Sequence, residues 1–372
     1  MTFVIITHVP HIKIQNTYFA YAPYVREMNL WIKSADKVII VAPKTNLATT
    51  DIDLAYDHHN IEFVTVASFN SLSLKAIFSA ITKIPKIGWR IYTSMKRADH
   101  IHLRCPGNVG LLGSFVQVLF PKKIKTVKYA GNWDPKSKQP WSYRLQKRIV
   151  SNTFLSRNIQ VLVYGEWKGM TRNIKPFFTA SYNEEEKAPI LSKDLNGTVD
   201  FIFVGGLVKG KNPLYAVQLV EALFIKGHNV TLRLFGEGAE RKIVEHYIVE
   251  NNLDKIISLL GNQTKETLKT AYQGSHFVLL PSESEGWPKA LAEGMFWGCV
   301  PIATSVSCVP FMLDYGKRGI LLTMNLENNV KQISHCILDK EKYLAMTIAG
   351  HKWSQQFTLN LFEQKINSLV VN

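Results

Sequence analysis

Glu285 and Glu293 stand eight positions apart, and carboxylates at that spacing can hold the two ends of one elongated ligand. The apolar run 276–280 before them predicts a short buried strand, and Pro288 suits the first position of a helix, where an N–H would be unpaired in any case. If the whole span were helical, the carboxylates would lie about 12 Å apart along the axis, too far to hold one atom. Because a carboxylate accepts hydrogen bonds from vicinal hydroxyls, this spacing fits a ligand with a diol at each end, such as a nucleotide sugar. The alternative is one glutamate favoured by the helix dipole and one exposed glutamate, both of which are common.

The segment around these glutamates, residues 281–304, reads PSESEGWPKALAEGMFWGCVPIAT. It closely resembles the signature of glycosyltransferase family 4, the retaining enzymes of the GT-B fold. The positions of that signature are filled here by Pro281-Ser282, Glu285-Gly286, Glu293, Gly298 and Pro301. The resemblance implies that Glu285 orients the donor sugar and that Glu293 holds the ribose. It also places Gly286 and Trp287 beside the donor.

The loop after the apolar run 199–204 holds a second group of candidates. Relatives usually have Gly-Arg-Leu here and a Lys five residues after the Arg, and both cations hold the donor diphosphate. Lys211 falls on the Lys position and Gly206 replaces the Arg, so Lys209 is the candidate for a second charge. The alternative for either Lys is a solvated side chain on a glycine-rich loop.

Further loops resemble the walls of the nucleotide site. Gly236 and Glu237 lie in a loop that in relatives approaches the base, where glycine permits close approach of the backbone. Asn262 occupies a similar position one strand later. In the first half, Gly131 and Asn132 stand where relatives often have a His. Asn132 either contacts a substrate hydroxyl or stabilises a turn through its side chain.

The order of the expected elements predicts an α/β chain. Apolar runs alternate with helical segments, which favours parallel sheets joined by right-handed crossovers, with ligands at the carboxyl ends of the strands. The expected strands are 3–7, 37–41, 100–104, 126–129, 199–204, 231–235, 256–260, 276–280 and 300–303, and the expected helices are 109–120, 214–225, 240–250, 265–272 and 361–370.

The length of 372 residues allows two domains, and the resemblance implies the GT-B architecture, in which two Rossmann-like doubly wound domains face each other across a central cleft. We predict an N-terminal acceptor-binding domain at 1–183, joined by a C-terminal helix at 358–372. A change of composition indicates a linker at 184–198, and the nucleotide-sugar-binding domain then covers 199–357.

The net positive charge is concentrated in the first half of the chain. Residues 1–182 hold 25 Lys and Arg against 9 Asp and Glu, whereas the rest holds 19 against 20. This excess predicts an anionic partner for the first half. In residues 75–97, cations alternate with Ile, Phe, Trp and Tyr, a pattern that suits an anionic membrane surface. The alternative is that these apolar residues pack into the core, since Pro85 and Gly88 interrupt a long helix.

We expect no metal and no cofactor beyond the co-substrate. Asp51 and Asp53 have the spacing of a metal-binding pair, but they lie in a polar loop without the strand that such a pair requires. We see no basic leader and no apolar run long enough to span a bilayer, so we expect a cytoplasmic protein, peripheral at the inner membrane face. The cysteines lack metal-ligand spacing and are few for a disulfide framework; they are Cys105, Cys299, Cys308 and Cys336.

These features together predict a retaining, metal-independent glycosyltransferase. It transfers a sugar from a UDP- or GDP-sugar to a saccharide acceptor, which we expect to be lipid-linked, in surface or exopolysaccharide synthesis. One alternative is an inactive GT-B partner protein, which Gly206 favours. The other is a basic nucleic-acid-binding protein, which shows no recognition motif and leaves the glutamate segment unexplained, so we expect no nucleic-acid partner.

Overall fold

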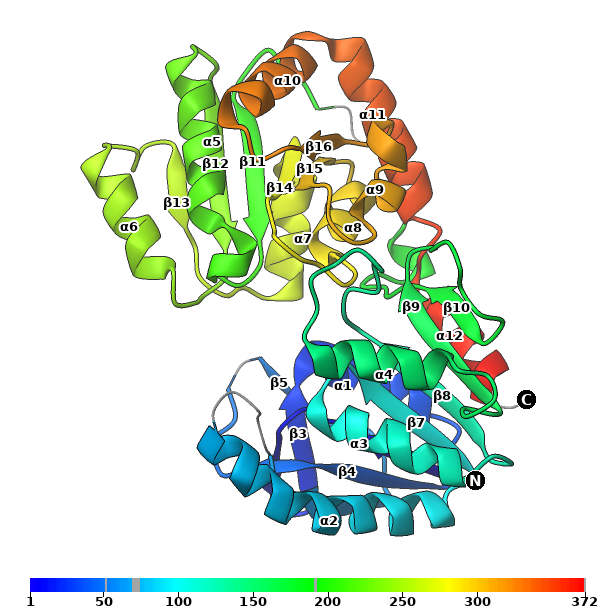
Figure 1. The fold of residues 1–372 in the computed structure, drawn as a ribbon. Helices are drawn as coiled ribbons and strands as arrows, with labels where there is room; N and C mark the ends of the chain where they lie inside the picture. Colours follow the sequence, from blue (N-terminus) through cyan, green and yellow to red (C-terminus); the bar gives the residue numbers. More distant parts are fainter. Residues whose placement is uncertain (51, 69–73, 191–192, 371–372) are drawn as a thin grey trace. The chain divides into compact units, whose positions relative to one another are not determined.

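The computed structural model describes residues 1–50, 52–68, 74–190 and 193–370, and of residues 74–81 the backbone alone. The chain divides into two compact units: unit 1 is Met1–Phe177 with Glu363–Asn372, and unit 2 is Phe178–Phe362 (Figure 1). The described part of the segment 184–198, which we expected to be a linker, belongs to unit 2. The division falls at Glu363 inside α12, Leu359–Val370, whereas we assigned this whole helix to the first domain.

Unit 1 is an α/β unit whose sheet has the strand order β6-β4-β1-β7-β8-β9-β10, with every neighbouring pair in that order parallel. The hairpin β2–β3 and the short β5 extend this sheet beside β4. Its strands are β1 Thr2–Ile6, β2 His11–Ile14, β3 Thr17–Tyr21, β4 Lys37–Thr45, β5 Asp53–Ala55, β6 Ile61–Val66, β7 His100–Cys105, β8 Ile124–Tyr129, β9 Ile159–Tyr164 and β10 Ile174–Phe177. Its helices are α1 Ala22–Ile32, α2 Leu74–Arg97, α3 Asn108–Val116 and α4 Trp141–Ser151, with a 3₁₀ turn η1 at Gln117–Leu119.

Helix α2 corrects one expectation, because it runs without a break through Pro85. A proline inside a helix removes one backbone hydrogen bond and costs about 3 kcal/mol. The inward face of the helix offsets this, since Ile87, Ile91 and Met95 are buried in the core of the unit. Each fully buried side chain of this kind contributes roughly 1.5–3 kcal/mol, so burial outweighs the local penalty.

Unit 2 is a six-stranded parallel sheet of order β13-β12-β11-β14-β15-β16. Its strands are β11 Val199–Val204, β12 Val230–Phe235, β13 Ile257–Leu259, β14 Phe277–Leu280, β15 Val300–Thr304 and β16 Ile320–Leu322. Its helices are α5 Pro213–Ile225, α6 Arg241–Glu250, α7 Lys265–Gly274, α8 Lys289–Phe296, α9 Val309–Met312, α10 Leu326–Leu338 and α11 Lys340–Ser354, with 3₁₀ turns η2 Glu184–Glu186, η3 Lys209–Lys211 and η4 Asp314–Gly316. Every strand and helix that we predicted in this unit is present, with ends that differ by at most two residues.

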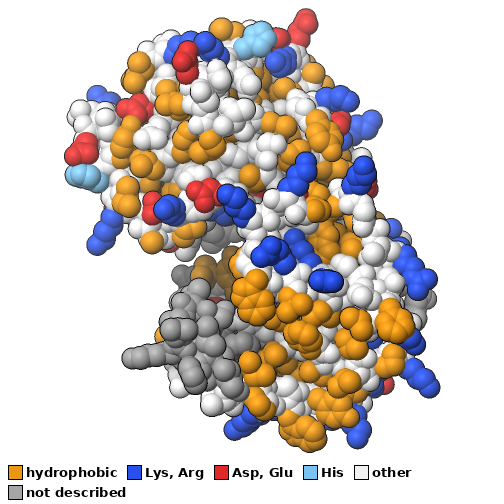
Figure 2. Space-filling model, in the orientation of Figure 1, with side chains coloured by type: hydrophobic (Ala, Val, Ile, Leu, Met, Phe, Trp, Pro, Cys, Tyr) orange, Lys and Arg blue, Asp and Glu red, His pale blue; other side chains and the backbone are white. Residues whose placement is uncertain are grey.

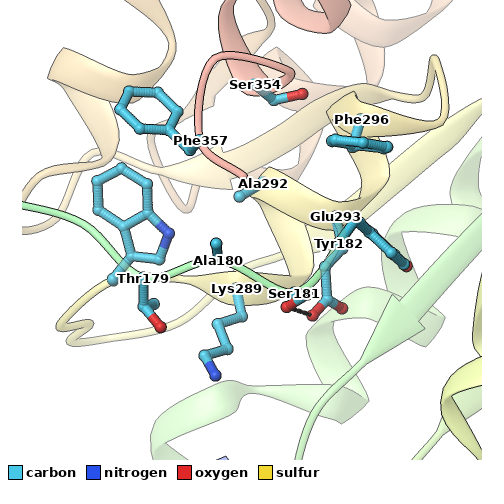
Figure 3. A pocket seen from close by; sticks show the side chains of 11 residues that line it. Thr179, Ala180, Ser181, Tyr182, Lys289, Ala292, Glu293, Phe296, Ser354 and Phe357 are labelled. Atoms are coloured by element: carbon cyan, nitrogen blue, oxygen red, sulfur yellow. Dashed lines mark hydrogen bonds between the residues drawn. The ribbon is translucent and has the colours of Figure 1, made fainter. Parts of the chain in front are cut away.

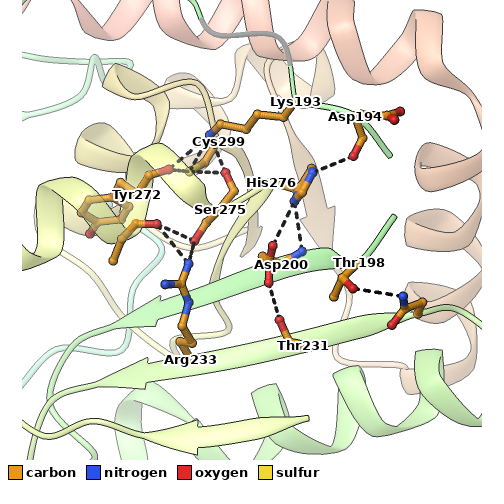
Figure 4. Close-up of polar contacts among 12 residues, drawn as sticks. Lys193, Asp194, Thr198, Asp200, Thr231, Arg233, Tyr272, Ser275, His276 and Cys299 are labelled. Atoms are coloured by element: carbon orange, nitrogen blue, oxygen red, sulfur yellow. Dashed lines mark hydrogen bonds and ion pairs between the residues drawn. The ribbon is translucent and has the colours of Figure 1, made fainter. Parts of the chain in front are cut away.

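The end of the segment that we expected to be a linker is held near the amino ends of β14 and β15 (Figure 4). The ammonium of Lys193 donates hydrogen bonds to the carbonyl oxygens of Tyr272 and Trp297, each at 3.1 Å, and to that of Ser275. The main chain then enters β11, where the N–H of Asp200 donates to His276 Nδ1 at 3.0 Å. A charged donor that satisfies several carbonyls holds this segment in a defined path, which agrees with its place inside unit 2.

Within the described residues, no helix combines the length and the hydropathy that crossing a membrane requires. All four cysteines are buried and free of disulfide bonds.

Candidate active site

The predicted site residues of unit 2 gather at the carboxyl edge of its sheet. Numbered in chain order, the strands run 3-2-1-4-5-6, so the order reverses between β11 and β14. In doubly wound sheets, ligands bind outside the carboxyl ends of the strands at this reversal point. Lys211 follows β11 and Glu285 follows β14, so both residues lie beside it.

Lys211 and Glu285 form an ion pair, with 2.5 Å between Lys211 Nζ and Glu285 Oε1. The Glu285 side chain is 7% exposed and that of Lys211 is 29% exposed. Two hydrogen bonds join their loops: the Glu283 N–H donates to Gly210 O at 2.9 Å, and Asn212 Nδ2 donates to Pro281 O at 2.8 Å. A buried carboxylate requires a partner of opposite charge. Here Lys211, in the loop after β11, is the partner of Glu285, in the loop after β14.

Gly206 and Lys209 lie in the same loop as Lys211, and both are exposed. A Cβ added at Gly206 would meet Glu237 O at 3.7 Å, an ordinary contact. The position that holds Arg in relatives therefore has room for a Cβ here.

Gly236 brings the loops after β11 and β12 into backbone contact. Its φ is +143°, and a Cβ at this position would lie 2.0 Å from Gly205 O. Two backbone hydrogen bonds join the loops, from Gly205 N to Phe235 O and from Leu207 N to Glu237 O, each at 2.9 Å. The glycine is thus required by the close approach that these bonds create.

Glu237 and Asn262 form the outer part of this edge. Glu237 Oε1 accepts a hydrogen bond from Arg241 Nη1 at 2.6 Å, and Arg241 Nε donates to Glu245 Oε1 at 2.7 Å. A Cβ at Gly261 would lie 2.9 Å from Glu237 Oε1, which places the loop with the exposed Asn262 beside this carboxylate. Sequence reasoning missed Arg241, although its spacing of four residues from Glu237 is that of a helical ion pair.

Glu293 is the fifth residue of α8 and has partners other than those of Glu285. One carboxylate oxygen accepts from the Ser181 hydroxyl, and the other accepts from the Tyr272 hydroxyl at 3.3 Å. Burial raises the pKa of Glu293 above its usual value, against the opposing effects of the Ser181 hydrogen bond and the Lys289 charge. Because α8 begins only at Lys289, the span between the two glutamates is not helical throughout, and Pro288 is the residue before the helix rather than its first.

A small pocket opens beside Glu293, within unit 2 (Figure 3). In this view the Ser181 hydroxyl points at the Glu293 carboxylate, and Lys289 lies alongside. The lining comes from the start of unit 2, from α8 and the residues before it, and from the end of α11 and the segment after it: Thr179, Ala180, Ser181, Tyr182, Trp287, Lys289, Ala292, Glu293, Phe296, Ser354 and Phe357. No sequence pattern indicated Ser181, which is 112 positions from Glu293 along the chain.

Gly286 and Trp287 connect Glu285 to the core of unit 2. Trp287 is 8% exposed, and its ring packs on Trp353 and Phe357, with centroid distances of 6.0 and 5.5 Å. The Cys308 thiol donates to Gly286 O at 3.0 Å. Burial, and then the charge of Glu285, raise the pKa of this thiol to about 12, so it keeps its proton. Trp287 thus has a packing role, and its contact with a donor stays a prediction.

Gly131 and Asn132 follow β8 of unit 1. Asn132 Oδ1 accepts a hydrogen bond from the Asp134 N–H at 2.8 Å, and Asp134 Oδ1 accepts from the Lys136 N–H at 2.8 Å. A Cβ at Gly131 would meet the Pro106 ring at 2.9 Å. Asn132 therefore stabilises a turn, as the second of our two interpretations has it, and its contact with a substrate hydroxyl stays a prediction.

The residues considered for a metal lie in unit 1. Asp51 is outside the described residues, and the Asp53 carboxylate accepts from the Thr50 N–H and hydroxyl, each at 2.9 Å. In the described ranges, no group of three or more His, Cys, Asp or Glu side chains is placed to share a metal ion.

Comparison with known proteins assigns a family to unit 2. Residues 183–353 match the family model of glycosyl transferases group 1. An uncharacterized glycosyltransferase of Methanocaldococcus jannaschii is 28% identical over 191 residues, which are 51% of this chain and 52% of that one. A Salmonella typhimurium protein, provisionally named as a colanic acid biosynthesis glycosyltransferase, is 24% identical over 46% of this chain and 45% of its own. The chain thus spans about half the length of these two curated relatives.

Solved structures resemble the chain over its whole length. Sucrose-phosphate synthase from Thermosynechococcus elongatus has a TM-score of 0.69 at 16% identity and covers 99% of this chain and 98% of its own. Anabaena HepE, solved in complex with UDP and glucose, has a TM-score of 0.67 at 13% identity and covers 100% and 99%. At these identities the likeness shows the fold alone. The chain therefore has the GT-B fold and carries, in its second unit, a glycosyl transferases group 1 domain.

Proposed function

We propose that this protein is a retaining, metal-independent glycosyltransferase that uses a UDP- or GDP-sugar and acts on a lipid-linked saccharide in surface or exopolysaccharide synthesis. The observation that carries the proposal is the ion pair of the half-buried Lys211 with the buried Glu285 at the reversal point of the unit 2 sheet. The Salmonella relative, named for colanic acid biosynthesis, supports the polysaccharide role. HepE, solved with UDP-glucose, supports a nucleotide-sugar donor.

Lys211 supplies positive charge to the donor diphosphate. Its ammonium has three N–H donors, so its bond to Glu285 leaves capacity for phosphate oxygens. The N-terminus of α8, which opens at Lys289 directly after the Glu285 loop, adds backbone donors and the positive end of a helix dipole. These groups stabilise the charge that develops on the leaving diphosphate, so no metal or other cofactor takes part.

Glu285 orients the donor sugar through hydrogen bonds to its hydroxyls, and its ion pair with Lys211 fixes the carboxylate in one position. Attack by the acceptor on the same face of the sugar follows from the family resemblance, with the leaving phosphate taking the acceptor proton. Glu293 holds the ribose with the lone pairs that remain beside its bond to the Ser181 hydroxyl.

The test compares nucleotide binding with turnover. UDP and GDP binding is measured by calorimetry, and release of sugar from a panel of radiolabelled UDP- and GDP-sugars is measured with and without EDTA. We expect Glu285→Gln to keep the nucleotide affinity of the parent and to lower turnover by a factor on the order of 10² or more. We expect Lys211→Met to weaken nucleotide binding, and EDTA to leave turnover unchanged.

Three results would contradict this proposal. Turnover lost with EDTA and restored by Mg²⁺ or Mn²⁺ would show that a metal takes part. Near-parent turnover in Glu285→Gln would remove Glu285 from the mechanism. Tight nucleotide binding by the parent without turnover of any sugar nucleotide would favour the inactive partner protein, which Gly206 suggests.

A further inference from the structure

Helices α2, α3 and α4 form one continuous layer on the unit 1 sheet. Helix α3 packs against α2 on one side and α4 on the other, and η1 continues α3 (Figure 1). The Tyr92 and Phe120 rings, 5.4 Å apart, join α2 to the end of η1. The loop after α4 returns to the same place, since Gln117 Nε2 donates to Ser156 Oγ at 2.7 Å and Asn158 Nδ2 to Pro121 O at 3.0 Å.

Large hydrophobic side chains stand exposed on this layer. They come from all of its parts and are 40–73% exposed: Trp89, Phe115, Leu119, Trp141, Phe154 and Leu155, which we call the apolar surface. Figure 2 shows hydrophobic side chains gathered over the helices of unit 1, with Lys and Arg around them. A cluster of this kind, on several elements at once, indicates a binding surface rather than scattered exposure.

The charge around the apolar surface is strongly positive. Residues 82–158 hold 16 Lys and Arg against two acidic residues, Asp99 and Asp134. Lys122, Arg148 and Arg157 are exposed, and the Arg157 guanidinium lies 5.3 Å from the centre of the Phe154 ring. An anionic partner with an apolar interior matches both properties of this surface.

We propose that the apolar surface of unit 1 docks onto an anionic lipid bilayer. Trp89, Leu119 and Phe154 then enter the boundary between headgroups and acyl chains, while Lys122, Arg148 and Arg157 meet the headgroups. The aliphatic Leu119 and Leu155 favour a bilayer over a nucleic acid, whose bases stack on aromatic rings instead. A second copy of this chain fits poorly, since two such positive surfaces repel each other.

This docking surface differs from the segment 75–97 that the sequence indicated. In α2 the apolar side chains of Ile87, Ile91 and Met95 face the core, and only Trp89 among its large described hydrophobic residues is more than a third exposed. The surface is therefore composite, and η1 and the loop after α4 supply half of its six residues. The inference deepens the proposed function and rests on it in one respect, namely the lipid-linked acceptor. An enzyme bound to the membrane meets such an acceptor at the membrane surface.

The experiment is co-sedimentation of the full chain with vesicles at low and high salt. The vesicles consist of phosphatidylcholine alone or of phosphatidylcholine with about 30 mol% phosphatidylglycerol. We expect binding to the anionic vesicles only, weakened by salt. Phe154→Ser and Leu119→Ser should each lower the partition coefficient about tenfold. Arg157→Gln should lower it about fivefold. The matched controls are Ile225→Ser and Leu338→Ser in unit 2, where the side chains are 76% and 75% exposed, and these should bind as the parent does.

Equal, negligible sedimentation with both kinds of vesicle at low salt would overturn the proposal. So would an equal loss of binding in the unit 2 controls, since the docking surface would then lie elsewhere. Dimers seen by light scattering and abolished by Phe154→Ser, without vesicle binding, would assign the surface to a second copy. Calorimetry with UDP and GDP on the same samples separates this test from the proposed function, because nucleotide binding does not depend on vesicles.

Discussion

A carboxylate that folding has partly removed from water responds to pH, and Glu293 is such a group. Burial raises its pKa above the usual 4.5. The folded chain therefore holds the proton of Glu293 to a higher pH than the unfolded chain does. Stability associated with this group falls as pH rises from 4.5 through the raised pKa, and the loss is complete above it. Each pH unit across this window corresponds to about 1.4 kcal/mol.

The variant Glu293→Gln tests this sign. A neutral amide keeps an oxygen that accepts from the Ser181 hydroxyl but removes the charge, so the variant should gain stability over the parent as pH rises from 4 to 7. Urea denaturation at each pH measures the difference in unfolding free energy. Glu327→Gln is the control, because that side chain is 81% exposed in an ion pair with Lys331. A difference between Glu293→Gln and the parent that does not change with pH would contradict the assignment.

At the scale of elements, the site of unit 2 is a set of post-strand loops bonded to one another. The loop after β11 contacts those after β12 and β14, and the N–H of Gly236 donates to Gly261 O at 2.8 Å, which adds the loop after β13. Movement of one loop therefore displaces the loops bonded to it and changes the position of Lys211.

The glycines of these loops give a matched pair of variants. Gly236→Ala places a Cβ 2.0 Å from Gly205 O, whereas a Cβ at Gly210 has nothing within 4 Å. We expect Gly236→Ala to lower the free energy of unfolding by about 1–3 kcal/mol and to weaken nucleotide binding through the displaced β11 loop. Gly210→Ala should change stability by less than about 0.5 kcal/mol. Denaturation and calorimetry measure both effects, and equal behaviour of the two variants would show that the loops do not depend on this contact.

The elements of unit 2 were largely predictable because most residues of its strands are apolar and buried, and the strands lie between turn residues. Segment 199–204 coincides with β11 for this reason. In unit 1 the strands β2, β3, β5, β6, β9 and β10 were missed; of these, β2, β3 and β5 are partly exposed and only three to five residues long, so they carry little periodicity. The position of Glu285 followed from its loop, but the partners of Glu293 did not. Ser181 and Tyr272 come from distant parts of the chain, and packing alone brings them together.

At the scale of the whole molecule, the two units carry different chemistry. The predicted donor residues of unit 2 lie on nearly neutral sequence, whereas residues 1–182 hold 25 cationic against 9 acidic side chains. Such a division suits a chain in which one unit binds the nucleotide sugar and the other binds the surface that presents the acceptor. Each unit has its own doubly wound sheet, so each can present a rigid edge or face to its ligand.

Hydrogen exchange on the full chain tests this division of labour. The nucleotide that calorimetry identifies, UDP or GDP, should slow exchange of backbone amides at 205–212, 236–241 and 281–296, because these loops and the start of α8 surround the Lys211–Glu285 pair. Anionic vesicles should instead slow exchange at 115–120 and 152–157, which carry much of the apolar surface. With both ligands present, the two sets of protected amides should add. Nucleotide protection that leaves the unit 2 loops unchanged, or vesicle protection centred on unit 2, would contradict the assignment of these ligands to separate units. The Lys211→Met chain is the control, since it should lose the nucleotide protection and keep the vesicle protection.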